Sequence, residues 1–211
     1  MRAGSQIVAA ALLAAATYGV LVGIAEAKVD AAVGGGAFPL DDRRVPEREA
    51  FERIRARLEE IGEGRFSDRL EALRVERVLW VAPSLGPDRW AVFAESLRLV
   101  RRVYVRQKAL LDPRAHLYPS PSAVPDAHQR AFAWISLAGA LRHELAHHEG
   151  MIEEHEAYAT EMAWYEGVRA SPWFAALRGE DLRMFDWALQ SAVLTARSAS
   201  ARSGAGTRAR P

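Results

Sequence analysis

The sequence predicts a single α+β domain in which helices surround a small sheet, and three observations support this class. Two central stretches, VERVLWVAP and RWAVFAESLRLVRRVYVRQKALLDP, are rich in β-branched and apolar residues and end at prolines, as strand regions do. A long proline-free stretch follows, and one glycine divides it into two helices joined by a tight turn. Residues 173–196 are amphipathic and predict a C-terminal helix on the outside.

The composition is that of one folded domain with its own core. The chain has 211 residues, of which 50% are hydrophobic and 26% are charged, and it has no cysteine. A formal net charge of +1 provides no broad positive field, so nucleic acid is not expected as a partner. Without thiolates, any metal site has to use histidine and carboxylate ligands.

Residues 1–27 predict a segment that directs the chain to a membrane. Arg2 precedes an apolar run from Ile7 to Ala25, and the sequence AEA at 25–27 is typical of a cleavage site. The run approaches the ~20 residues that span a bilayer, so a cleaved signal peptide and a transmembrane anchor both remain open. In either case Arg2 favours a cytoplasmic amino end, which predicts an extracytoplasmic domain, anchored in the membrane or secreted, on the periplasmic face if the cell is bacterial.

The following stretches predict a linker, a helix, strands and a tail. Residues 28–45 combine glycines, prolines and charges without periodicity, as a linker does, so the folded domain is expected over 46–197. Its first stretch has apolar residues at helical spacing and predicts an amphipathic helix. The strand around Val103 to Val105 alternates with arginines, which predicts a half-exposed edge strand able to align an extended peptide. The tail, residues 198–211, is expected to be disordered.

The strongest chemical signal lies in HELAHHEGMIEEHEAYATE, nineteen residues that hold four of the six histidines and six glutamates. His143 and His147 form an HExxH motif, whose i, i+4 spacing places both imidazoles on one helix face, where they can bind one Zn²⁺. Glu144 is placed to take a proton from the metal-activated water and return it to a leaving amine. Because the chain reverses at Gly150, Glu153 or Glu154 in the next helix can supply the third ligand that a catalytic zinc site needs.

The second helix carries further candidates on one face. Glu154, Tyr158 and Glu161 follow one another at i, i+4 and i+7. Tyr158 is a candidate hydrogen-bond donor to the oxyanion, and Glu161 is a candidate acceptor that orients His143 through its free ring nitrogen. His148 and His155 lie off or beside the metal-facing stripe, so they are not expected to bind the metal.

The HExxH motif resembles that of the zincin metallopeptidases, where it supplies two histidine ligands and the catalytic glutamate. The ExxA pattern of residues 154–157 is similar to a signature of the gluzincin branch, which implies Glu154 as the third ligand. The two motifs lie closer together here than in gluzincins, and Tyr158 replaces their Asp or Asn. A metzincin-like pattern, HExxHxxGxxE, would instead assign the ligand to Glu153. The resemblance implies a minimal zincin-like fold, a Zn²⁺ cofactor and a peptide or protein substrate.

The favoured function is therefore a membrane-anchored or secreted zinc metallopeptidase, with His143, His147 and Glu154 as ligands and Glu144 as general base and acid. Two other classes remain open. Glu144 and His147 also form the ExxH of carboxylate-bridged di-iron bundles, although no second ExxH is visible on another helix. The same residues can also hold zinc for stability in a catalytically silent scaffold.

Overall fold

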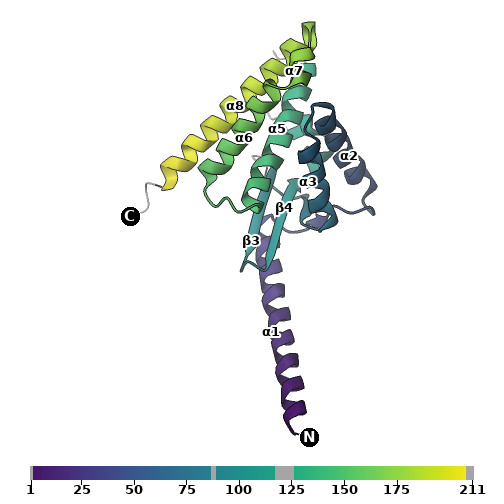
Figure 1. The fold of residues 1–211 in the computed structure, drawn as a ribbon, viewed down its shortest axis with the longest axis vertical. Coiled ribbons are helices and arrows are strands. Elements are labelled where there is room, and N and C mark those ends of the chain that lie inside the picture. Colours follow the sequence, from purple (N-terminus) through teal and green to yellow (C-terminus); the bar gives the residue numbers. More distant parts are fainter. Residues whose placement is uncertain (1, 87–88, 117–125, 208–211) are drawn as a thin grey trace.

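The computed structural model describes residues 2–86, 89–116 and 126–207, with the backbone alone at 2–12, 115–116 and 204–207. Helices surround one small sheet (Figure 1), so the predicted α+β class is confirmed. In chain order the elements are α1 (Arg2–Ala32), β1 (Phe38–Pro39), α2 (Val45–Glu60), α3 (Gly64–Val75), β2 (Leu79–Ala82), β3 (Ala91–Ser96), β4 (Val100–Arg106), α4 (Gln107–Leu111), the 3-10 turn η1 (Pro113–His116), α5 (Asp126–His148), α6 (Glu154–Arg169), α7 (Pro172–Ala176) and α8 (Gly179–Thr207).

The four strands form one mixed sheet in the order β1-β2-β4-β3. β2 and β4 are parallel, with Leu79 opposite Val103, whereas β3 pairs with β4 in the antiparallel sense, with Phe93 opposite Val103. β4 therefore lies inside the sheet. The edge strands are β1 and β3, and β3 runs beside α5 (Figure 1).

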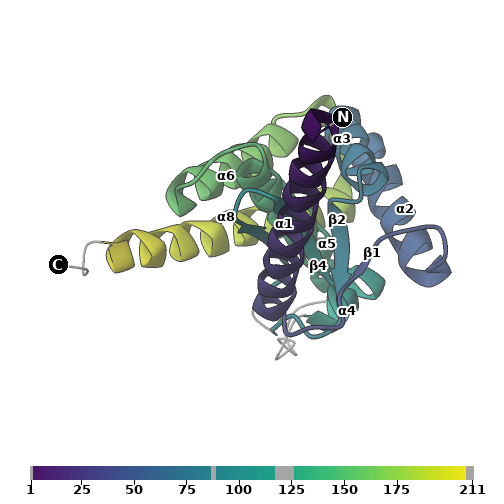
Figure 2. The same cartoon turned by 90° about the horizontal axis from the view of Figure 1, so that it is seen from below.

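The prediction that Val103 to Val105 form an edge strand is wrong, because β4 lies between β2 and β3. Alternating arginines suggested a face open to water, but Arg102 is only 7% exposed. Its guanidinium forms ion pairs with Glu26 (2.8 Å) and Asp30 (3.0 Å) of α1, which lies across that face of the sheet (Figure 2). The alternation in a strand reports only that its two faces differ. A charged helix facing the strand produces the same pattern as water does.

Two apolar cores lie on the two faces of the sheet. Val103 and Val105 enter the larger core with residues of α2, α3 and α5, whereas Tyr104 enters a smaller core with Ala25 and Val29 of α1. On the first side, α5, α6 and α8 lie against one another, and the carboxyl end of α5 lies beside β3 (Figure 1). This arrangement brings the HExxH motif to the edge of the sheet.

The amino-terminal segment differs from its prediction. α1 is one continuous helix through Ala27 to Ala32, and Ala25 and Val29 are buried against the sheet. Cleavage after Ala27 would therefore cut a helix that packs as part of the domain. In the part of the chain that the structure describes, no helix has both the length and the apolar character needed to cross a membrane. The prediction of a transmembrane helix is wrong on this finding, and the location outside the cytoplasm stays a prediction.

The predicted linker and the predicted tail also differ from the elements in the structure. The stretch predicted as a linker, residues 28–45, contains the last turn of α1 and also β1, which pairs with β2. The tail predicted to be disordered continues α8 as far as Thr207, and residues 208–211 lie outside the described residues. The tail extends a helix that Ala192 and Ala196 already anchor in the core.

Candidate metal centre

α5 brings the two histidines of the HExxH motif to a common point. Its body is apolar and buried, so it holds His143 and His147 rigidly one turn apart. The two Nε2 atoms lie 3.2 Å from each other. Two nitrogens at 2.0–2.1 Å from one tetrahedral zinc ion would be about 3.3 Å apart. The imidazoles therefore already have the spacing of a shared metal ion.

A carboxylate of α6 faces the same point. Gly150 takes the left-handed conformation (φ +113°) that ends α5, and after a short loop α6 begins at Glu154. One oxygen of Glu154 lies 3.3 Å from Nε2 of His143, and the other lies 3.7 Å from Nε2 of His147. Glu153 precedes the helix, is exposed, and makes no such contact with the histidines of the described chain. Of the two predicted alternatives, Glu154 is the one brought to the histidines.

The second ring nitrogen of each histidine also has an acceptor. Nδ1 of His147 lies 2.8 Å from the carbonyl oxygen of Met151, so a proton there leaves Nε2 free to bind a metal. Nδ1 of His143 lies 3.3 Å from Oε2 of Glu161, the residue predicted to orient it. Nδ1 of His143 is buried and makes no hydrogen bond with the described residues, so its contact with the Glu161 carboxylate is electrostatic. Glu161 is itself held by the Tyr165 hydroxyl, which donates to Oε1 at 2.7 Å.

A glycine that the sequence did not single out makes this support possible. A Cβ atom at Gly139 of α5 would lie 1.9 Å from the Tyr165 hydroxyl oxygen. Only a glycine lets the phenol approach α5 closely enough to reach Glu161. Gly139 and His143 belong to α5, whereas Tyr165 and Glu161 belong to α6, so this series of contacts joins the two helices. No local pattern in the sequence marks it, because the partners come together only in the fold.

Glu144 lies between the histidines and the sheet. Its Oε2 accepts a hydrogen bond from the backbone N–H of Phe93 in β3, at 2.6 Å. Burial raises the pKa of the Glu144 carboxyl, and the neighbouring His143 and the Phe93 N–H only partly oppose this shift. A more basic carboxylate is better matched to proton transfer near neutral pH.

Glu144 also competes with Glu154 as the third ligand. His143, Glu144 and His147 each offer a ligand atom within 4.8 Å of the others. The Phe93 N–H occupies one oxygen of Glu144, however, whereas both oxygens of Glu154 lie next to the two Nε2 atoms. The donor set that would fit zinc is therefore two imidazoles and the Glu154 carboxylate, which would leave Glu144 free of the metal.

Electrostatics affects the other titratable groups of the site as well. Burial alone would lower the pKa of His143, but Glu161, Glu144 and Glu154 together raise it. Burial is the main cause that raises the pKa of Tyr158, and nearby carboxylates add to it, so this phenol keeps its proton at neutral pH. The Tyr158 ring lies against His143, with 4.3 Å between the ring centroids, so it lines the site, and its role as a hydrogen-bond donor stays a prediction.

Two other histidines of the cluster lie away from the metal point. The ring of His148 meets the ring of Phe93 edge-on, and burial with the charge of Arg101 lowers its pKa. His155 is exposed at the start of α6. Neither belongs to the group of described residues that can share an ion.

An open cleft of about 1480 Å³ leads to these residues, with walls from β3, α5, α6 and α8. The carbonyl of Trp90 accepts from the N–H of Arg106 in β4, and strand residues alternate in direction, so Ala91, Phe93 and Glu95 direct their backbone groups to the open edge. The cleft therefore combines a free strand edge with the histidines. The edge strand at the site is β3 rather than the strand predicted from the arginines.

Comparison with models of known families, with curated proteins and with solved structures found no match to this chain. The function is therefore argued from the geometry of the site.

Proposed function

We propose that this chain is a zinc-dependent metallopeptidase whose metal ligands are His143, His147 and Glu154. The observation that carries the proposal is the convergence of three donors: two Nε2 atoms 3.2 Å apart and a carboxylate within 3.3 Å and 3.7 Å of them. Three protein ligands with one open position are the arrangement of catalytic zinc sites. Zinc held there would supply Lewis acidity, which makes a water molecule more acidic and a carbonyl carbon more electrophilic.

Glu144 acts as the general base and acid. Its carboxylate takes a proton from the attacking water and delivers that proton to the nitrogen of the leaving amine, so the same group is restored at the end of a cycle. Desolvation, which raises its pKa, favours this exchange at neutral pH. Tyr158 keeps its proton and donates a hydrogen bond to the oxygen that becomes negative as the carbonyl is attacked.

The substrate is a peptide or protein segment in extended form. The outward backbone groups at Ala91 and Glu95 can pair with such a segment as an added strand. The Phe93 N–H already engages Glu144 between them, so an added strand places its backbone next to the base. In this proposal β3 aligns the substrate, in place of the strand around Val103 to Val105 that the sequence suggested.

The di-iron alternative receives no support from the described residues. A carboxylate-bridged pair of ions needs two sets of ligands, and the described chain offers one group of three, at His143, Glu144 and His147. The carboxylate of Glu161 lies beside Nδ1 of His143, on the opposite side of the ring from Nε2. It is thus placed to orient a ligand instead of bridging two ions.

The experiment that tests the proposal is hydrolysis of a quenched-fluorescent peptide library by the zinc-loaded full chain and by Glu144→Gln. The variant should bind zinc as the wild type does and lose about 10²-fold or more in kcat, because proton transfer is removed. Glu156→Gln, an exposed change on α6, is the matched control and should keep full activity. A zinc-loaded wild type without peptidase activity would favour the silent scaffold and contradict the proposal.

A further inference from the structure

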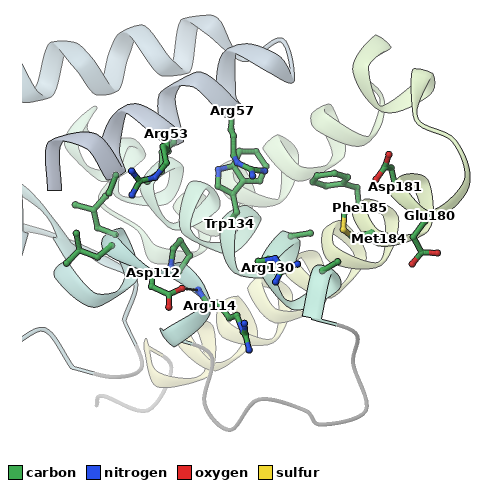
Figure 3. Close-up of a pocket in the computed structure, with 17 residues that line it drawn as sticks. Arg53, Arg57, Asp112, Arg114, Arg130, Trp134, Glu180, Asp181, Met184 and Phe185 are labelled. Atoms are coloured by element: carbon green, nitrogen blue, oxygen red, sulfur yellow. Dashed lines mark hydrogen bonds between the residues drawn. The ribbon is translucent and has the colours of Figure 1, made fainter. Parts of the chain in front are cut away.

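A second cavity, of about 480 Å³, lies beside the first turns of α5 (Figure 3). The metal centre lies at the carboxyl end of the same helix. Its walls come from α2, the α4–η1 region, and the amino-terminal parts of α5 and α8. This volume falls within the range of small-molecule sites in proteins. The cavity shares no lining residue with the cleft of the metal centre.

The inner surface of this cavity is apolar. Ile54 and Leu110 are buried at its wall, and Trp134 of α5 presents a large ring there. Met184 and Phe185 of α8 are half-buried on the facing side (Figure 3). Such a surface gains free energy when an apolar group replaces water against it.

Arginines at the wall give the cavity a positive side. Arg53 and Arg57 lie one turn apart on α2, and neither pairs with a carboxylate among the described residues. The Arg57 guanidinium lies 5.8 Å from the centre of the Trp134 ring, at the edge of the apolar surface. Two guanidinium groups without acidic partners next to an apolar cavity are suited to an anion.

The other charged residues at the wall do not neutralise Arg53 and Arg57. Arg114 and Arg130 both pair with Asp126, and the carboxylate of Asp112, also at the wall, accepts a hydrogen bond from the backbone N–H of Arg114. Figure 3 places Glu180 and Asp181 on the side of the cavity away from α2, and Glu180 is paired with an arginine of its own helix. The unpaired positive charge is therefore concentrated on the α2 side.

We propose that this cavity binds a small amphiphile with an apolar body and one anionic group, such as a medium-chain carboxylate. The apolar body lies against Trp134, Met184 and Phe185, and the anionic group meets the guanidinium groups of Arg53 and Arg57. A planar guanidinium binds a carboxylate through two parallel hydrogen bonds, which a neutral head group cannot reproduce. The proposal does not depend on the metal centre.

Isothermal titration calorimetry of the full chain tests it with three ligands of equal chain length: dodecanoate below its micelle concentration, dodecan-1-ol and dodecyltrimethylammonium. We expect one dodecanoate per chain, bound at least about tenfold more tightly than the alcohol, because the charged hydrogen bonds are lost with the alcohol. The cation should show no saturable binding. Equal affinity for all three ligands, or no saturable binding of dodecanoate, would overturn the proposal.

Variants locate the binding. The double change Arg53→Gln and Arg57→Gln should weaken dodecanoate at least about tenfold, and Ala127→Phe should abolish binding by filling the cavity. The matched control is Arg65→Gln with Arg197→Gln, which removes the same charge at exposed positions that do not line the cavity. Circular dichroism shows whether each variant is folded. Equal loss in the control pair, or full binding in folded Ala127→Phe, would also overturn the proposal.

Discussion

Replacing Gly139 by alanine is expected to destabilise the fold and to weaken the metal centre, although the residue touches no metal ligand directly. The added Cβ would lie 1.9 Å from the Tyr165 hydroxyl oxygen and 2.4 Å from the ring carbon that bears it. Tyr165 is 2% exposed, so its ring has no open space into which to move. The substitution must therefore both crowd α5 against α6 and displace the Tyr165 hydroxyl from its hydrogen bond to Glu161.

The magnitude follows from three contributions to the free energy of unfolding. Overpacking a core costs about 1–3 kcal/mol. Loss of a buried hydrogen bond to a charged acceptor, here Glu161, costs about 1.5–3 kcal/mol. Alanine in a helix interior gains about 1 kcal/mol over glycine, which offsets part of this loss. The net expectation for Gly139→Ala is a decrease of roughly 1.5–5 kcal/mol.

Urea unfolding followed by circular dichroism measures this change. The control is Gly167→Ala on α6, where no atom lies within 4 Å of the added Cβ, and its stability should stay the same or rise by up to about 1 kcal/mol. Zinc affinity, measured by competition with a chelator, should fall about 10- to 100-fold in Gly139→Ala only, because His143 loses the support of Glu161. A Gly139→Ala protein with wild-type stability and affinity would refute this reasoning.

Three other predictions concern single side chains. Glu161→Gln should lower zinc affinity about 10- to 100-fold in the same competition assay, whereas the exposed Glu166→Gln should leave it unchanged; equal effects would argue against a positioning role. Arg102→Met should decrease the free energy of unfolding by about 1–3 kcal/mol, since it removes the cation that pairs with Glu26 and Asp30 of α1, and an unchanged urea midpoint would show that this contact contributes little. Arg74 and Arg48 lower the pKa of Glu71 from 4.5 to about 2. The stability that the Glu71 carboxylate contributes is therefore present above pH 4.5 and is lost as the pH falls towards 2. Glu71→Gln should accordingly flatten the decline of urea stability over that interval, and parallel curves for wild type and variant would contradict the assignment.

The parts of the site that depend on local spacing were accessible from the sequence. The i, i+4 spacing of His143 and His147 fixes a shared helix face, and Gly150 marks the reversal that returns α6 to the same place. The choice between Glu153 and Glu154 needed the fold, because one residue of rotation at the start of α6 decides which carboxylate faces the histidines.

Features that depend on contacts between distant segments were not accessible. Arg102 looked exposed because its two acidic partners lie in α1, more than seventy residues earlier in the chain. Gly139 resembled an ordinary helix glycine because the phenol that needs its space belongs to α6. The contact of Phe93 with Glu144 likewise required the position of β3 at the sheet edge.

The most direct test of the central claim is the metal content of the untagged full chain, purified without chelator and measured by inductively coupled plasma mass spectrometry. The proposed site predicts one zinc per chain in the wild type, in Glu153→Ala and in Glu144→Gln, and a loss of most of that zinc in Glu154→Ala. A wild type without metal, a chain with two irons, or zinc lost with Glu153→Ala and kept with Glu154→Ala would contradict it.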